Sequence, residues 1–135
     1  GFERPPENVM TLSAIEIKAF VPARHFEKSK DFYATLGFEI AWSTHELASV
    51  RHGTTGFLLQ KFYVADHTNN FMMHLLVDNA DAWHAHVIAS GLIGKYQLRI
   101  EPPEDRSWGL RDFPLVDPSG VLWRIGHVLP PSDGA

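Results

Sequence analysis

The chain repeats one pattern of elements, and this repeat limits the possible folds more than any other feature of its 135 residues. Residues 13–62 predict a strand, a helix and three further strands, and residues 71–128 predict the same order. A repeat of about 55 residues indicates a duplicated supersecondary unit that cannot bury its apolar face alone. We therefore expect an α+β protein in which two mixed sheets pair and curve around a shared concave cavity.

The first half begins with a strand whose apolar residues alternate along "SAIEIKAFVPA", residues 13–23. Residues 25–38 then predict a helix, because Phe26, Phe32, Tyr33 and Leu36 form an apolar stripe. Glycine follows that stripe and is a natural helix end. Three short segments, "FEIAWST", "ELASVRHG" and "GFLLQKF", complete the unit as strands.

The second half has a strand at 71–77 and a helix at 79–91. Three strands are predicted after it, at "YQLRIE", "LRDFPLV" and "VLWRIGHV", with "DPSG" as the turn between the last two. Residues 99–108 carry two prolines and five charges, which exclude a central strand and indicate an exposed loop beside the final hairpin.

These boundaries predict one domain over residues 1–135. Its parts are an N-terminal arm at 1–12, a first βαβββ module at 13–62, a linker at 63–70, a second module at 71–128 and a C-terminal tail at 129–135.

Composition excludes several classes of protein and site. The chain has no cysteine, so disulfides and thiolate metal sites are excluded, and a net charge of -4 argues against a nucleic-acid partner. No apolar run approaches the roughly 20 residues of a membrane helix, and the first residues lack the apolar core of a signal peptide. We expect a cytoplasmic protein with no membrane partner.

Three motifs resemble the glyoxalase/bleomycin-resistance/extradiol-dioxygenase superfamily, also called vicinal oxygen chelate. They are "VPARHFEKSKDFYATLGF", "LLVDNADAWHAHV" and the closing hairpin "WGLRDFPLVDPSGVLWRIG", which is similar to the bleomycin-resistance branch. The resemblance covers residues 14–127. It implies two βαβββ modules with the helices outside and a cup on the concave side.

With that architecture, strand alternation assigns side chains to two faces. The side chains expected beneath the helices are Ile15, Ile17, Ala19, Val21, Met73, Leu75, Val77, Trp123 and Ile125. The opposite set is expected to line the cup: Glu16, Lys18, Phe20, Met72, His74, Leu76, Leu122 and Arg124.

The resemblance also implies where a metal would bind, and those positions hold Lys18, Met72 and Arg124. Two cations and a thioether are unsuitable ligands for a divalent ion, so no metal and no cofactor are expected. His74 shares a face with Met72 and leaves one alternative open, an off-register metal site with Glu16 and Gln60.

The predicted ligand-binding residues combine cations, apolar side chains and one exposed indole. They are Lys18, Phe20, Met72, His74, Trp108, Arg111, Leu122 and Arg124. Two structural alternatives remain open at this point: Trp108 can serve packing at a dimer or hinge, and Arg124 can form an internal salt bridge with Glu16.

We expect a metal-free protein of the bleomycin-resistance type that captures a small organic molecule in the cavity of a homodimer. One alternative is a metal-dependent lyase or dioxygenase of the same superfamily. Another is a metal-free enzyme in which His74 is the general base and Arg124 stabilises an oxyanion. His74 is the best catalytic candidate if the chain is an enzyme.

Overall fold

The computed structural model describes residues 12–131, and these form two βαβββ modules. The first module contains one four-stranded sheet, the first sheet, in the order β1-β4-β3-β2. Its elements are β1 (Phe20–Pro22), α2 (Phe26–Leu36), β2 (Glu39–Ser43), β3 (Leu47–His52) and β4 (Thr55–Gln60). Strand β1 runs parallel to β4, whereas the other neighbours are antiparallel.

The second module repeats this topology in a second sheet of order β5-β8-β7-β6. Its elements are β5 (Met72–Leu76), α4 (Ala80–Ala89), α5 (Leu92–Tyr96), β6 (Glu104–Asp105), β7 (Leu110–Val116) and β8 (Leu122–Val128). A short helix, α3 (Ala65–Thr68), lies in the predicted linker. The predicted α+β class and duplicated module are confirmed, and the two sheets do not join into one closed sheet.

Helices α2 and α4 form where the sequence pattern predicts them, whereas α3 and α5 were not predicted. The buried side of α2 carries Phe26, Phe32, Tyr33 and Leu36, and the helix ends at Gly37. Gly37 adopts a left-handed φ of 116°, a conformation that a side chain disfavours. Helix α4 packs on β7 and β8 in the second module, as α2 packs on β2 and β4 in the first.

A buried polar contact joins the two modules. The Tyr33 hydroxyl of α2 donates to Asp117 Oδ2 at 2.6 Å and accepts from the Trp123 indole N–H at 2.9 Å. Asp117 belongs to the turn before β8, where its other oxygen accepts the backbone N–H groups of Ser119 and Val121. Burial raises the pKa of Tyr33 well above its ordinary value, and it raises the pKa of Asp117 too. These fully used hydrogen-bonding groups fix α2 against the second module.

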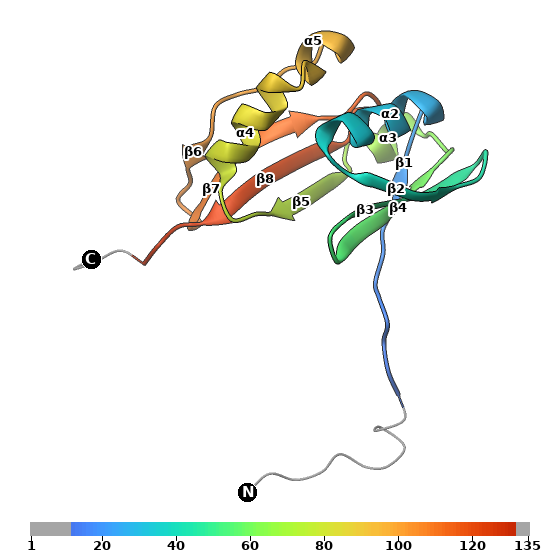
Figure 1. The fold of residues 1–135 in the computed structure, drawn as a ribbon, viewed down its shortest axis with the longest axis horizontal. Coiled ribbons are helices and arrows are strands. Elements are labelled where there is room, and N and C mark those ends of the chain that lie inside the picture. Colours follow the sequence, from blue (N-terminus) through green and yellow to red (C-terminus); the bar gives the residue numbers. More distant parts are fainter. Residues whose placement is uncertain (1–11, 132–135) are drawn as a thin grey trace, which may run out of the picture.

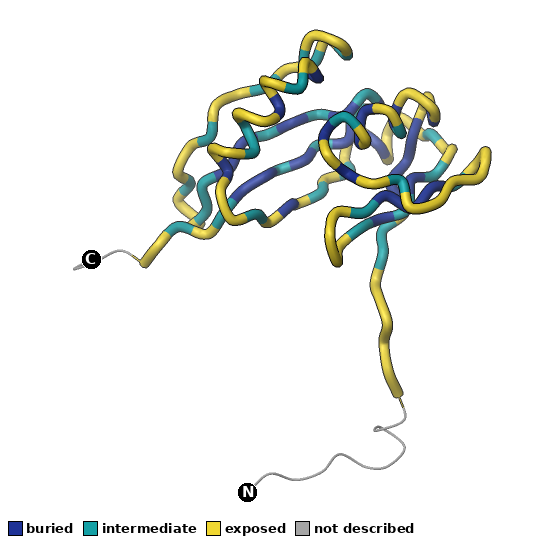
Figure 2. The backbone as a smooth tube through the Cα atoms, viewed as in Figure 1, coloured by how far each residue is buried: buried dark blue, intermediate teal, exposed yellow. Residues whose placement is uncertain are grey.

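Each sheet buries one face against the helices, and the other face is only partly exposed. Leu75, Trp123 and Ile125 point into the core as predicted, and Met73 and Val77 are half-buried. The core is continuous across both modules, whereas the helices and strand edges carry most of the exposed backbone (Figure 2). Both helices lie on the same side of the sheets, and the N-terminal segment leaves on the opposite side (Figure 1).

The first strand is much shorter than predicted. Only Phe20–Pro22 pair with β4, and Ile15 and Ile17 are 97% and 93% exposed rather than buried beneath α2. The prediction that these two isoleucines are buried beneath α2 is therefore wrong. Residues 12–19 form an extended segment, which we call the arm; the predicted arm at 1–12 otherwise lies outside the described residues.

The predicted strand at residues 96–101 is also wrong. Helix α5 ends at Tyr96, and only Ile100 forms an isolated bridge, to Leu115. The edge strand β6 instead lies at Glu104–Asp105, inside the stretch predicted as a loop. The prolines before β6 cannot donate ladder hydrogen bonds, which restricts the strand to two residues at the sheet edge.

Among residues 12–131, no helix is long and apolar enough to cross a membrane.

Replacing Tyr33 by phenylalanine tests the contact that joins the modules. The variant leaves Asp117 and the Trp123 indole short of one buried partner each, so we expect unfolding free energy to fall by about 2–3 kcal/mol. Urea denaturation measures the change. Tyr96→Phe is the matched control, because Tyr96 donates to the exposed Asp31 and its loss should matter far less. Equal effects of the two substitutions would contradict this role for Tyr33.

Candidate functional site

Most of the predicted ligand-binding residues gather on one exposed face of the second sheet, opposite α4. The strand register pairs Met72 with Leu122 and His74 with Arg124. Met72 is 59% exposed, and Leu122 and Arg124 are half-buried. We call this surface the outer face, and it comprises Met72, His74, Leu76, Asp112, Leu122 and Arg124.

Trp108 borders the outer face from the turn between β6 and β7. Gly109 closes this turn with a φ of 90°, and its N–H donates to the Arg106 carbonyl at 3.1 Å. This turn leaves the Trp108 side chain 59% exposed. The Arg124 guanidinium carbon lies 6.0 Å from the centre of the Trp108 ring, at the outer limit of a cation–π contact.

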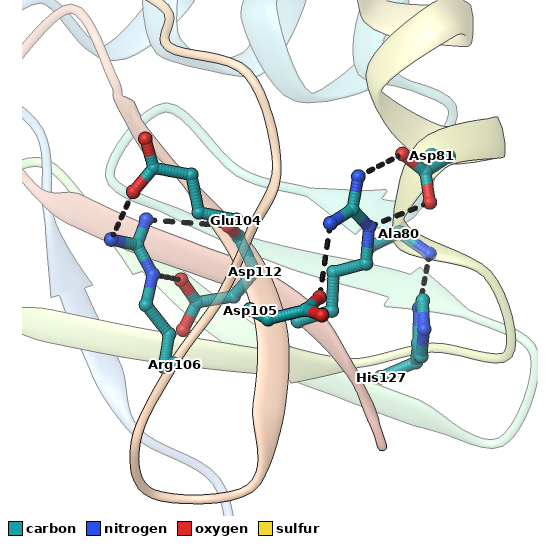
Figure 3. Close-up of polar contacts among 8 residues, drawn as sticks. Ala80, Asp81, Glu104, Asp105, Arg106, Asp112 and His127 are labelled. Atoms are coloured by element: carbon teal, nitrogen blue, oxygen red, sulfur yellow. Dashed lines mark hydrogen bonds and ion pairs between the residues drawn. The ribbon is translucent and has the colours of Figure 1, made fainter. Parts of the chain in front are cut away.

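Arg124 forms an internal salt bridge, but its partner is Asp112 rather than the predicted Glu16. One guanidinium nitrogen of Arg124 lies 3.3 Å from Asp112 Oδ1, and Arg106 Nε donates to the same oxygen at 2.8 Å. Figure 3 shows Arg106 bonded to both Glu104 and Asp112. The Arg106 contacts hold the 101–109 loop against β7, and the Arg124 charge is partly compensated before any ligand binds.

Lys18 and Phe20 belong to the first module, whereas the outer face belongs to the second sheet. The Glu16 carboxylate accepts from Arg51 at 2.8 Å and lies 3.5 Å from the Lys18 ammonium. The Arg51 hydrogen bond holds the pKa of Glu16 below its ordinary value. Phe20 is 53% exposed and pairs with Leu58 on β4. A single chain therefore places the predicted site residues on two separate sheets.

Arg111 takes part in a different set of contacts, with Asp81 of α4 and Asp105 of β6. Its guanidinium binds both oxygens of Asp81 at 2.9 Å and Asp105 at 3.0 Å. The Arg111 hydrogen bond lowers the pKa of Asp81. His127 Nδ1 accepts the Ala80 N–H at the start of the same helix, at 2.8 Å. These contacts anchor α4 to β7 and engage the Arg111 guanidinium with two carboxylates.

No cluster suited to a metal ion occurs within residues 12–131, where no three His, Asp or Glu side chains come together. His74 lies on β5, whereas Glu16 is bound to Arg51 beside the first sheet. This arrangement gives no support to the off-register site of His74, Glu16 and Gln60.

Two hollows lie along the seam between the modules. They have volumes of about 330 and 300 Å³ and share His52, Ala82 and Trp83. The His52 and Trp83 ring centres are 5.2 Å apart, and His86 Nε2–H donates to the Leu36 carbonyl oxygen at 2.8 Å. This seam was not predicted as a site.

Asp112 is the principal site residue that the sequence analysis missed. The strand "LRDFPLV" places Phe113 and Leu115 in the core, so Asp112 must face the other way, toward the set that includes Arg124. An aspartate within an apolar strand, on the same face as an arginine in the next strand, was a usable signal. To use this signal one must know that Asp112 pairs with Gly126 across the strands, because this register brings Arg124 near Asp112.

Comparison with known families identifies the superfamily. The model of the Glyoxalase/Bleomycin resistance protein/Dioxygenase superfamily matches residues 15–125, most of the chain. The chain belongs to this superfamily. No curated protein sequence matches it.

Solved structures agree on the fold and differ in the activities that their names state. A bleomycin-binding protein complexed with bleomycin is 23% identical, with a TM-score of 0.72 over 84% of this chain and 98% of that one. TnmS3, an antibiotic-binding protein from Streptomyces sp. CB03234, is 23% identical, with a TM-score of 0.67 over 87% and 99%. Lactoylglutathione lyase from Agrobacterium tumefaciens is 13% identical, with a TM-score of 0.62 over 86% and 95%. At these identities the similarity establishes the shared fold alone.

Replacing Arg106 by glutamine tests whether it holds the 101–109 loop on β7. Asp112 is fully buried and loses its shorter ionic contact, so the unfolding free energy should fall by about 2–4 kcal/mol. Hydrogen exchange of the loop amides should also become faster. Urea denaturation and exchange mass spectrometry measure the two effects.

Lys95→Gln is the matched control for this prediction, because the Lys95–Asp31 ion pair is largely exposed and joins α5 to α2 without touching the loop. It should change stability much less and leave exchange near Trp108 unaltered. Faster loop exchange in the Lys95 variant than in the Arg106 variant would contradict the assignment.

Proposed function

We propose that the chain is a small-molecule-binding protein of the bleomycin-resistance type, which captures an organic ligand on the outer face of its second sheet. The observation that carries this proposal is the exposed set of Trp108, Met72 and Leu76, each 59% exposed, around the Arg124 guanidinium. Ligand pockets combine apolar walls with a few placed polar groups, and this face has both.

The similarity to a bleomycin-binding protein and to TnmS3 supports a binding function over other uses of the fold. A protein that sequesters an antibiotic protects by stoichiometric capture and needs no turnover. The ligand-binding set on the outer face is Met72, His74, Trp108, Leu122 and Arg124.

The absence of cysteine from the chain supports a cytoplasmic site of action.

The binding unit is a homodimer in which the first sheet of one copy covers the outer face of the other. The arm supports this arrangement, because Leu12, Ile15 and Ile17 are 77%, 97% and 93% exposed. Exposed apolar side chains in such a continuous segment are typical of an interaction surface. The dimer would bring Lys18 and Phe20 of one copy to the outer face of its partner, which a single chain does not do.

The proposed site works without a metal, because the positions that bind metal in the implied pattern hold Lys18, Met72 and Arg124. Similarity to a lactoylglutathione lyase keeps a metal-dependent lyase as the second candidate. A metal-free enzyme with His74 as general base is the third. Turnover of a bound ligand that is lost in His74→Ala, with binding retained, would favour that enzyme over simple capture.

Trp108 should report ligand binding to the outer face. We expect bleomycin, or a planar aromatic compound found in a screen, to quench tryptophan emission stoichiometrically. The ligand should be recovered unchanged. Trp108→Phe should lose most of the quenching and bind about threefold to tenfold more weakly, because a smaller ring stacks less well. Fluorescence titration and calorimetry measure these changes.

Trp83→Phe is the control, since Trp83 belongs to α4 and lines the seam between the modules. This variant should bind as the wild type does. Loss of binding in the Trp83 variant, with binding retained in the Trp108 variant, would move the site to the seam and contradict the proposal.

The arm should be required for the dimer. We expect the double variant Ile15→Asp/Ile17→Asp to sediment as a monomer, whereas the wild type sediments as a dimer, because charged side chains cannot be buried in the interface. Ala14→Asp, an exposed change on the opposite side of the same extended segment, is the control and should remain dimeric. A wild type that sediments as a monomer, or a double variant that remains dimeric, would contradict the role of the arm.

A further inference from the structure

Asp112 has one carboxylate oxygen that the protein leaves unused. Its side chain is fully buried, and Oδ1 accepts from both Arg106 and Arg124. Among residues 12–131, no hydrogen-bond partner reaches Oδ2 (Figure 3). Buried carboxylate oxygens are nearly always hydrogen-bonded, so an unpaired one requires a physical explanation.

The strand register shows why this carboxylate lies on the outer face. Asp112 is the cross-strand partner of Gly126, where an added Cβ would lie 2.7 Å from the Asp112 Cβ. Glycine at this position therefore makes room for the Asp112 side chain. Arg124 lies two residues before Gly126 on the same face, which brings its guanidinium to the carboxylate.

Arg124 already occupies the place of a bound cation. One of its guanidinium nitrogens lies 3.3 Å from the Asp112 carboxylate, and its guanidinium carbon lies 6.0 Å from the centre of the Trp108 ring. A carboxylate and an aromatic ring are the groups that recognise organic cations. The Arg124 contact is longer than the 2.8 Å contact of Arg106, and the Arg124 side chain is 32% exposed. Arg124 can therefore move into solvent while Arg106 stays in place.

We propose that Asp112 anchors a cationic N–H group of the ligand, which donates to Oδ2 and takes the place of Arg124 beside Trp108. This inference rests on the proposed function and narrows the ligand to planar organic cations such as amidinium or guanidinium compounds. Within the ligand-binding set, Arg124 then compensates the Asp112 charge in the empty site and moves aside when the ligand binds.

Charge balance gives the expected order of ligands. A cation that replaces Arg124 keeps the buried Asp112 carboxylate paired, and it also satisfies the oxygen that is free in the empty protein. A neutral amide supplies a weaker donor. An anion would compete with Asp112 for Arg124 and would leave the buried carboxylate with less compensation.

Three probes of the same ring size test this order by calorimetry on the full chain: benzamidinium, benzamide and benzoate. The wild type should bind benzamidinium at least about tenfold more tightly than either of the others. Asp112→Asn should abolish this preference. Arg124→Gln should strengthen benzamidinium binding about twofold to fivefold, because the competing cation is removed.

Arg124→Gln also decides the test if Asp112→Asn does not fold, since Arg124 is partly exposed and its removal leaves Asp112 paired with Arg106. The proposal is overturned if the wild type does not bind benzamidinium, if benzoate binds more tightly, or if Arg124→Gln weakens benzamidinium binding. It is also overturned if a folded Asp112→Asn retains the preference, which would mean that solvent alone serves Oδ2.

Failure of the anchor is distinguishable from failure of the binding function. If planar compounds quench Trp108 regardless of their charge, the outer face binds ligands and only the role of Asp112 is wrong. If no compound in the screen quenches Trp108, the proposed function is wrong as well.

Discussion

The hydrogen bonds of Tyr33 with Asp117 and Trp123 determine how the two modules are placed. Each module must cover one face of its sheet, and a single helix covers it incompletely. The buried Tyr33 contact brings α2 against the second module, so that both halves complete one core. With the helices and the core on one side, the other faces of both sheets remain partly exposed.

The proposed ligand-binding residues project from the side of the second sheet opposite the core. Phe113 and Leu115 secure β7 to the core, while Asp112, directly before Phe113, and the neighbouring Arg124 project from the other side of the sheet. Because successive strand residues alternate between the faces, substitutions at exposed positions such as Met72 and Leu76 can alter ligand preference without removing a core side chain. This separation is a physical reason why one fold supports binding proteins and lyases alike.

The sequence predicted what local periodicity determines. The strand–helix–three-strand repeat, the end of α2 at Gly37 and the final hairpin depend on nearby residues, and each is confirmed. The arm could not be predicted in the same way, because the alternation of Ile15 and Ile17 indicates a strand but does not say which chain it pairs with. The short strand β6 shows a second limit of prediction from sequence. Its two residues have no strand pattern of their own, and they form an edge strand because they pair with β7.

The candidate site was predicted in part for the same reason. The alternation of strand residues placed Met72, His74, Leu122 and Arg124 on one face. The partner of Arg124 could not be predicted, because it depends on how β7 is aligned with β8.

Whether the outer face forms a metal-free pocket between two copies is tested most directly by native mass spectrometry of the full chain. The account predicts the mass of two chains without a bound divalent ion. A single-chain mass, or a stoichiometric divalent metal on the protein, would contradict it.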